Sequence, residues 1–148
     1  GAAPLVKIFS GLNGSLIASF TVADAASVGG IRVAAGDING DGRADIVTAE
    51  GPGGRPRVCV FEGLTQAKIY EFYGYDYAYR GGVYVAAGDL TGDGKADIVV
   101  GPGAGHAPEV RAFHGAVTVY LAKFVGLDVA SSKPPHRARE PPLAVMRR

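Results

Sequence analysis

Two nine-residue segments rich in aspartate and glycine, 52 residues apart, constrain this chain more than any other feature. The first reads Asp-Ile-Asn-Gly-Asp-Gly-Arg-Ala-Asp over residues 37–45, and the second reads Asp-Leu-Thr-Gly-Asp-Gly-Lys-Ala-Asp over residues 89–97. Oxygen-bearing side chains fall on positions 1, 3, 5 and 9, and the glycine at position 6 allows a sharp turn. The candidate ligands of one cation are therefore Asp37, Asn39, Asp41, the backbone carbonyl of Arg43, and Asp45, and those of a second are Asp89, Thr91, Asp93, the carbonyl of Lys95, and Asp97.

These donors match the preference of Ca2+, which takes about 6 to 8 oxygen ligands at roughly 2.3–2.6 Å. The alternative is a pair of surface turns, because Asp, Asn and Gly form turns without any metal. Three carboxylates within nine residues repel one another unless a cation neutralises them, and the pattern occurs twice. We therefore predict two Ca2+ sites.

The loops differ from the EF-hand, which requires a bidentate Glu at position 12. Thr48 and Val100 stand at that position. Apolar β-branched segments, 46–48 and 98–100, follow the loops instead, and they are typical of buried strands.

A shift of 52 residues aligns much of the chain with itself. It places 30–37 on 82–89 and 56–63 on 108–115, and it places 4–11 on 56–63. We therefore divide the chain into a half-repeat (1–30), two complete repeats (31–82 and 83–130) and a Pro- and Arg-rich tail (131–148). The tail lacks apolar periodicity and is predicted to be disordered.

Each complete repeat is predicted to hold four short strands. These are 31–35, 46–49, 57–62 and 68–73 in the first, and 83–87, 98–100, 110–113 and 117–124 in the second. Four antiparallel strands per period of this length are typical of a β-propeller blade. The predicted fold is all-β, with about two and a half blades. Since a propeller closes with about 4 to 8 blades, this is an incomplete propeller, and further blades must come from a parent chain or from self-association.

Composition limits the class of protein. The chain has 148 residues, 23 glycines, no tryptophan and a net charge of +1, which suits one β-rich domain and gives no sign of a nucleic-acid surface. A single cysteine excludes an internal disulfide. No apolar run reaches the ~18 residues of a membrane span. The start, Gly-Ala-Ala-Pro, suggests a piece of a longer protein.

Other residues carry weaker signals. Cys59 aligns with Lys7 and Arg111, so we expect it to face water as a free thiol without a catalytic base. His106 and His114 are expected to be solvated. The aromatic residues between Tyr70 and Tyr79 allow an alternative interpretation as a lectin-like carbohydrate-binding module. No nucleophile is paired with a base, so the chain is not expected to be an enzyme, although it could be an accessory segment of a larger extracellular enzyme.

The loops, their trailing Ala-Asp-Ile-Val and the Gly82–Asp89 segment resemble the FG-GAP, or VCBS, repeats of bacterial extracellular proteins and of the integrin α propeller. The resemblance covers residues 4–130. It implies Ca2+ binding by the loops on one rim of a propeller, a secreted or cell-surface location, and a role in adhesion or recognition of a protein or glycan. Thr91 departs from the usual Asn or Asp, which implies a weaker second site.

Overall fold

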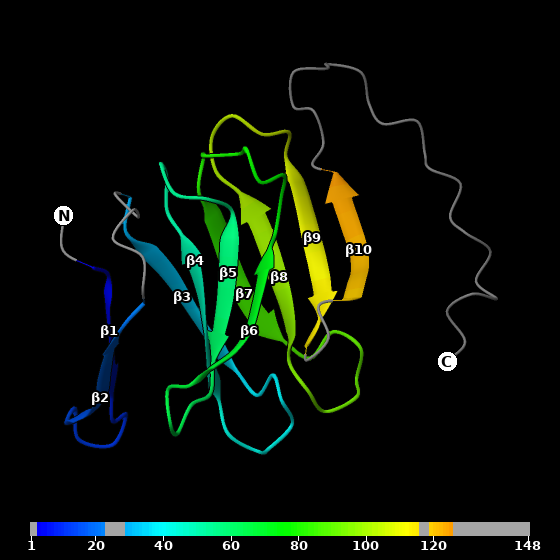
Figure 1. The fold of residues 1–148 in the computed structure, drawn as a ribbon. Helices are drawn as coiled ribbons and strands as arrows, with labels where there is room; N and C mark the ends of the chain where they lie inside the picture. The colour runs from blue at the N-terminus through cyan, green and yellow to red at the C-terminus, as the bar shows by residue number, and fades with distance from the viewer. Residues whose placement is uncertain (1–2, 23–28, 116–118, 126–148) are drawn as a thin grey trace.

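The structure, a computed structural model, describes residues 3–22, 29–115 and 119–125, which form ten β-strands in three antiparallel sheets (Figure 1). The N-terminal hairpin pairs β1 (Leu5–Phe9) with β2 (Leu16–Thr21). The second sheet has the order β3 (Ile31–Gly36), β4 (Asp45–Glu50), β5 (Arg57–Phe61), β6 (Lys68–Tyr73). The third has the order β7 (Val83–Gly88), β8 (Asp97–Pro102), β9 (Glu109–His114), β10 (Val119–Val125). The predicted all-β class with four-stranded blades is confirmed, and the three sheets formed by the described residues do not close into a ring.

The two complete repeats share one strand register. Ile31 pairs with Glu50 and Gly36 with Asp45, while 52 residues later Val83 pairs with Pro102 and Gly88 with Asp97. The strands lie close to their predicted ranges, and β6 matches its range. The predicted tail, 131–148, lies outside the described residues, and so do residues 117–118 of the last predicted strand.

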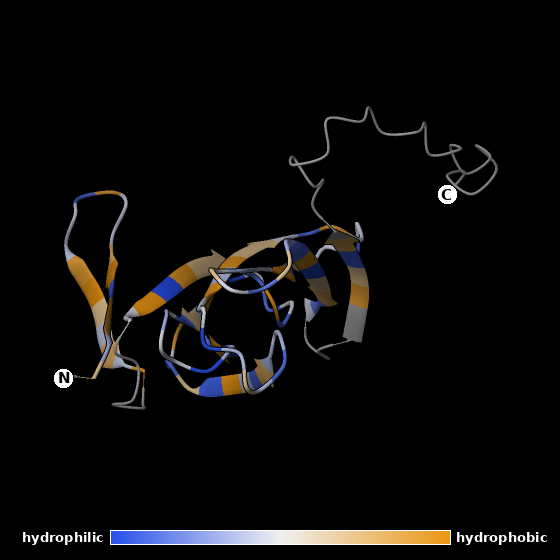
Figure 2. Ribbon diagram, turned by 90° about the horizontal axis from the view of Figure 1, so that it is seen from above, coloured by the Kyte–Doolittle hydropathy of each residue, from blue (hydrophilic) through white to orange (hydrophobic). Residues whose placement is uncertain are grey.

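The main core lies between the two four-stranded sheets. Val47, Val58 and Val60 of the first sheet are fully buried against Val83, Ile98 and Val100 of the second. Burying an aliphatic side chain of this size contributes roughly 1.5–3 kcal/mol. In Figure 2 the hairpin and the two sheets lie side by side, and hydrophobic and hydrophilic residues alternate along the strands.

The hairpin covers the other face of the first sheet, and this overturns one expectation. Cys59 is only 4% exposed, because Val6 and Val22 of the hairpin segment pack with Cys59 and Phe61. Alternation had placed Cys59 on the face of Lys7, but Lys7 belongs to the outermost hairpin, whose corresponding face is uncovered. Burial, together with the nearby Glu71 carboxylate, raises the pKa of the Cys59 thiol from 9.0 to about 11.

The loops separate into two rims. The segments 37–45 and 89–97 lie at one end of the strands, and the turns 51–56 and 74–82 lie at the opposite end (Figure 1). None of the described segments forms a helix with the length and apolar character needed to cross a membrane.

Candidate metal centre

Asp45 is the central residue of the first loop, which joins β3 to β4. Its side chain is 0% exposed. One carboxylate oxygen accepts hydrogen bonds from the N–H groups of Ile38 (3.0 Å) and Asn39 (3.1 Å), and the other accepts one from the N–H of Gly63 (3.2 Å). Asp45 therefore ties the start of the loop to the turn that follows β5.

The rest of the loop folds around the Asp37 carboxylate. Its Oδ1 accepts the N–H groups of Gly40 (2.7 Å) and Asp41 (3.1 Å), and its Oδ2 accepts that of Gly42 (2.8 Å). Gly40 and Gly42 have φ values of 85° and 84°, a conformation that glycine adopts at little cost. The tight turn predicted at position 6 is therefore present.

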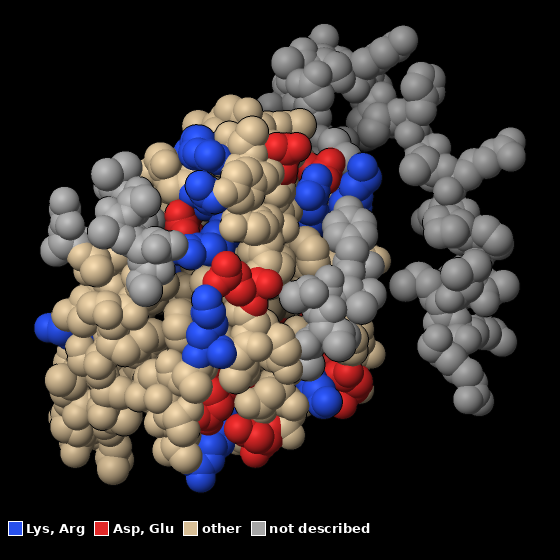
Figure 3. Space-filling view, viewed as in Figure 1, with Lys and Arg blue, Asp and Glu red and all other residues tan. Residues whose placement is uncertain are grey.

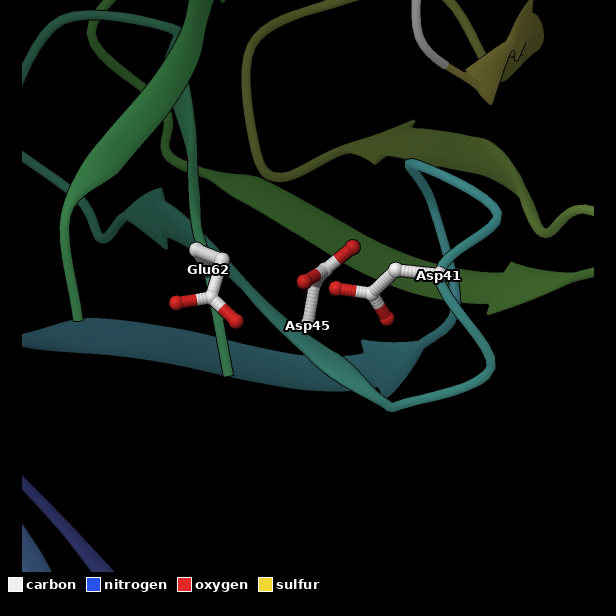
Figure 4. Close-up of side chains that lie close together, drawn as sticks. All are labelled: Asp41, Asp45 and Glu62. Carbon is white, nitrogen blue, oxygen red and sulfur yellow. The ribbon is translucent and has the colours of Figure 1, made fainter. Parts of the chain in front are cut away.

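Three carboxylates converge at this loop. Oxygens of Asp41, Asp45 and Glu62 all lie within 4.8 Å of one another (Figure 4). Two ligands of one Ca2+ can be up to about 5 Å apart, since each lies roughly 2.3–2.6 Å from the ion. This spacing fits a hard cation.

Glu62 was not among the residues predicted from the sequence. It directly follows β5 and precedes Gly63, whose amide binds Asp45. Hydrogen bonds from the Thr65 hydroxyl, and from the amides of Leu64 and Thr65, lower the pKa of Glu62. Its carboxylate is therefore anionic at neutral pH. The only sequence signal was its position one residue before a glycine shared by the repeats.

The remaining predicted ligands of the first loop are not part of the three-carboxylate cluster. Asn39 donates its side-chain amide to Asp41 (3.2 Å) and accepts the Asp41 N–H (2.8 Å), so it lies against the cluster. The Asp37 oxygens accept loop amides, but a carboxylate oxygen has two lone pairs and Oδ2 accepts one described amide. The carbonyl groups of Arg43 and Lys95 stay predictions.

The second loop repeats this arrangement. Asp97 is also 0% exposed, and it accepts the N–H groups of Leu90 (2.8 Å), Thr91 (3.1 Å) and Gly115 (3.3 Å). Asp89 accepts those of Gly92, Asp93 and Gly94. The same hydrogen-bond pattern thus recurs on the equivalent aspartates of the two blades.

The two loops differ in the residue that contacts their aspartates from the end of the third strand of each blade. His114 occupies the place of Glu62, with Nδ1 2.8 Å from Asp97 Oδ1 and Nε2 3.4 Å from Asp93 Oδ2. The expectation that His114 is merely solvated is therefore wrong. Burial raises the pKa of Asp97, but hydrogen bonds from His114 and from backbone amides outweigh it, so the pKa is lowered overall. The sequence predicted no partner for His114, because the contact forms only when β9 pairs with β8 and brings His114 beside Asp97.

The loops also contact each other. The N–H of Ala96 in the second loop donates to the carbonyl of Asp37 in the first (2.7 Å). A Cβ on Gly36 would lie 2.8 Å from the Cβ of Ala96, so the two blades approach closely here. The two candidate centres therefore belong to one rim and one interface between blades.

The aromatic cluster divides between core and surface. Tyr75 is 3% exposed, and its hydroxyl donates to the carbonyls of Val100 (3.1 Å) and Glu109 (2.5 Å). Tyr73 and Tyr77 are exposed and meet edge to face with ring centroids 5.1 Å apart. Tyr75 thus joins the blades, and Tyr73 and Tyr77 are the more exposed rings of this cluster.

Comparison with protein-family models gives two matches. The model described as an FG-GAP-like repeat matches residues 37–100, and the model described as an FG-GAP repeat matches residues 81–120. Together they span both aspartate-rich loops and more than half of the chain.

Proposed function

This chain belongs to the FG-GAP repeat family, and we propose that its two aspartate-rich loops bind Ca2+ to stabilise one rim of a β-propeller. The observation that carries the proposal is the convergence of Asp41, Asp45 and Glu62 within 4.8 Å. In the first loop these residues, together with Asp37, Asn39 and the Arg43 carbonyl, would hold the ion. In the second loop Asp89, Thr91, Asp93, the Lys95 carbonyl and Asp97 would do so.

The role of the ion in this proposal is structural. The carboxylates of Asp41, Asp45 and Glu62 are close enough to repel one another, and a divalent cation would remove that repulsion. A ligand that binds only the folded state stabilises it by about 2.7 kcal/mol at 100 times its Kd. Because Ala96 of the second loop binds Asp37 of the first, ordering one loop would also support the other.

Calorimetric titration of Ca2+ into chelator-treated protein tests this proposal. Two binding events are expected, with Asp41→Asn removing one and Asp93→Asn the other. Asp76→Asn is the matched control, because Asp76 lies outside both loops. Its carboxylate accepts the Ala78 amide (2.9 Å), just as that of Asp41 accepts the Arg43 amide (2.8 Å). No heat of binding in the unmodified protein, or an equal loss in the control, would refute the assignment.

The second part of the proposal concerns the partner. The outer face of the third sheet exposes an apolar surface that includes Leu90, Leu121 and Phe124. A shift of 52 residues maps these onto Ile38, Ile69 and Phe72, which the next blade contacts in the first repeat. We propose that another blade of the same repeat type covers this face. The segment then acts as a non-enzymatic part of a secreted or cell-surface protein in adhesion or recognition.

Light scattering at increasing protein concentration tests this second part. We expect association that Phe124→Glu abolishes, while Leu12→Glu, at an exposed hairpin turn, leaves it unchanged. A chain that stays monomeric at all concentrations would show that copies of this segment do not supply the missing blade.

A further inference from the structure

We propose that the rim opposite the metal loops carries a binding site for an acidic saccharide, built around three arginines. A cavity of about 480 Å³ opens there, and it is lined by Glu50, Gly54, Arg55, Arg57, Tyr73 and Arg80. Figure 3 shows Lys and Arg side chains gathered in the upper part of the view, near the end of β4 and the start of β5. The size falls in the range of small-molecule pockets, roughly 300–1,000 Å³.

The cavity has a net positive charge. Its one carboxylate, Glu50, is already paired with Arg57, whose Nε lies 2.6 Å from Oε1. The backbone N–H of Arg55 donates to the other oxygen, Oε2 (2.9 Å). Within the described part of the chain, neither the Arg55 nor the Arg80 guanidinium forms an ion pair with a carboxylate. Two guanidinium charges are thus left for an anion.

These two arginines are held in place without a ligand. The guanidinium carbon of Arg55 lies 4.2 Å from the centroid of the Tyr77 ring, and that of Arg80 lies 5.9 Å from it. Arg80 Nη1 also donates to the carbonyls of Tyr77 (2.5 Å) and Tyr79 (2.9 Å). Since much of the ordering of these long side chains is already achieved, a ligand that binds them loses less entropy.

The backbone keeps the cavity in shape. The N–H of Gly53 donates to the Arg80 carbonyl (2.8 Å), which ties the turn 51–56 to the segment 74–82. A Cβ on Gly54 would lie 2.4 Å from Glu50 Oε2, so a larger residue would displace the carboxylate that orients Arg57.

The second blade lacks this site although it forms the same sheet. The shift of 52 residues replaces Glu50 with Pro102, Arg55 with Ala107 and Arg57 with Glu109. A blade therefore folds without the arginines, and their presence in one blade is not explained by folding. This inference is independent of Ca2+ binding at the other rim.

The residues indicate the class of ligand. Guanidinium groups bind carboxylate and sulfate oxygens through paired hydrogen bonds. Tyr73 is 41% exposed beside them, and its ring offers an apolar surface to the C–H face of a sugar. A uronic acid or sulfated sugar unit combines both properties.

Calorimetry with a trigalacturonate tests the proposal, with the uncharged trigalactose as the comparison. We expect binding of the acidic sugar alone, weakened at least tenfold by Arg55→Ala and by Arg80→Ala. Arg55→Lys keeps the charge but loses the paired donors, and it should weaken binding similarly. Lys7→Ala removes an exposed charge from β1 and should change nothing, and binding should persist in Asp41→Asn.

Absence of binding, or an equal loss in Lys7→Ala, would overturn the proposal. Inorganic sulfate that binds as tightly as the sugar would also overturn it, because the site would then recognise the anion without the ring. Thermal melts of each variant identify any loss that comes from unfolding.

Discussion

Asp45→Ala is expected to destabilise the protein even when no Ca2+ is present. The Asp45 carboxylate is fully buried and accepts the amides of Ile38, Asn39 and Gly63. Alanine leaves all three N–H groups without this acceptor. The substitution thus separates the structural role of Asp45 from any role as a metal ligand.

The magnitude follows from these three hydrogen bonds. A hydrogen bond to a charged group contributes about 1.5–3 kcal/mol, and a buried donor left unsatisfied costs about 1–3 kcal/mol. Water entering the exposed side of the loop recovers part of the loss. We expect the free energy of unfolding to fall by about 3–5 kcal/mol, which lowers the Tm by roughly 10–15 °C for a domain of this size.

Thermal and urea unfolding in excess chelator measure this effect. Asp41→Ala is the comparison, because Asp41 is exposed and accepts mainly local hydrogen bonds, so it should lose less than about 1 kcal/mol in chelator. If Asp45→Ala and Asp41→Ala unfolded alike in chelator, Asp45 would not be the structural tie that its contacts indicate.

Three further predictions concern single residues. The Cys59 thiol should resist alkylation at pH 8 in the folded state and react rapidly in urea. The pKa of Cys59 is raised from 9.0 to about 11 in the folded protein. The stabilisation that comes from this shift is therefore complete below pH 9 and is lost as the pH rises through 11. Thermal melts of the unmodified protein and of Cys59→Ala between pH 8 and 12 measure this loss. Tyr75→Phe removes the hydrogen bonds to Val100 and Glu109 and should cost about 1–2 kcal/mol, measured by urea unfolding, without changing sugar binding. Thr91→Asn should tighten Ca2+ binding at the second proposed site in calorimetry, since an amide oxygen is a better-placed donor at position 3, and an unchanged Kd would contradict this.

The sequence predicted the strands well because their signals are local. The aspartate-rich loops fix where β3 ends and β4 begins, and apolar alternation predicts the strands themselves. Glu62 and His114 could not be predicted as loop partners, because each lies at a strand end about 20 residues from the aspartates it meets. Only the antiparallel pairing of β4 with β5, and of β8 with β9, brings them back to the loop.

By itself, the sequence determined the repeat, its period of 52 residues and the aspartate-rich loops, since turn chemistry and strand alternation act between near neighbours. Only the tertiary structure decided which faces of the blades are covered. Cys59 is buried because a hairpin packs over it, and Tyr75 is buried because its ring packs in the core between the two four-stranded sheets. The structure likewise brought Arg55, Arg57 and Arg80 around one cavity. Such contacts depend on how separate blades pack, which no local pattern of residues encodes.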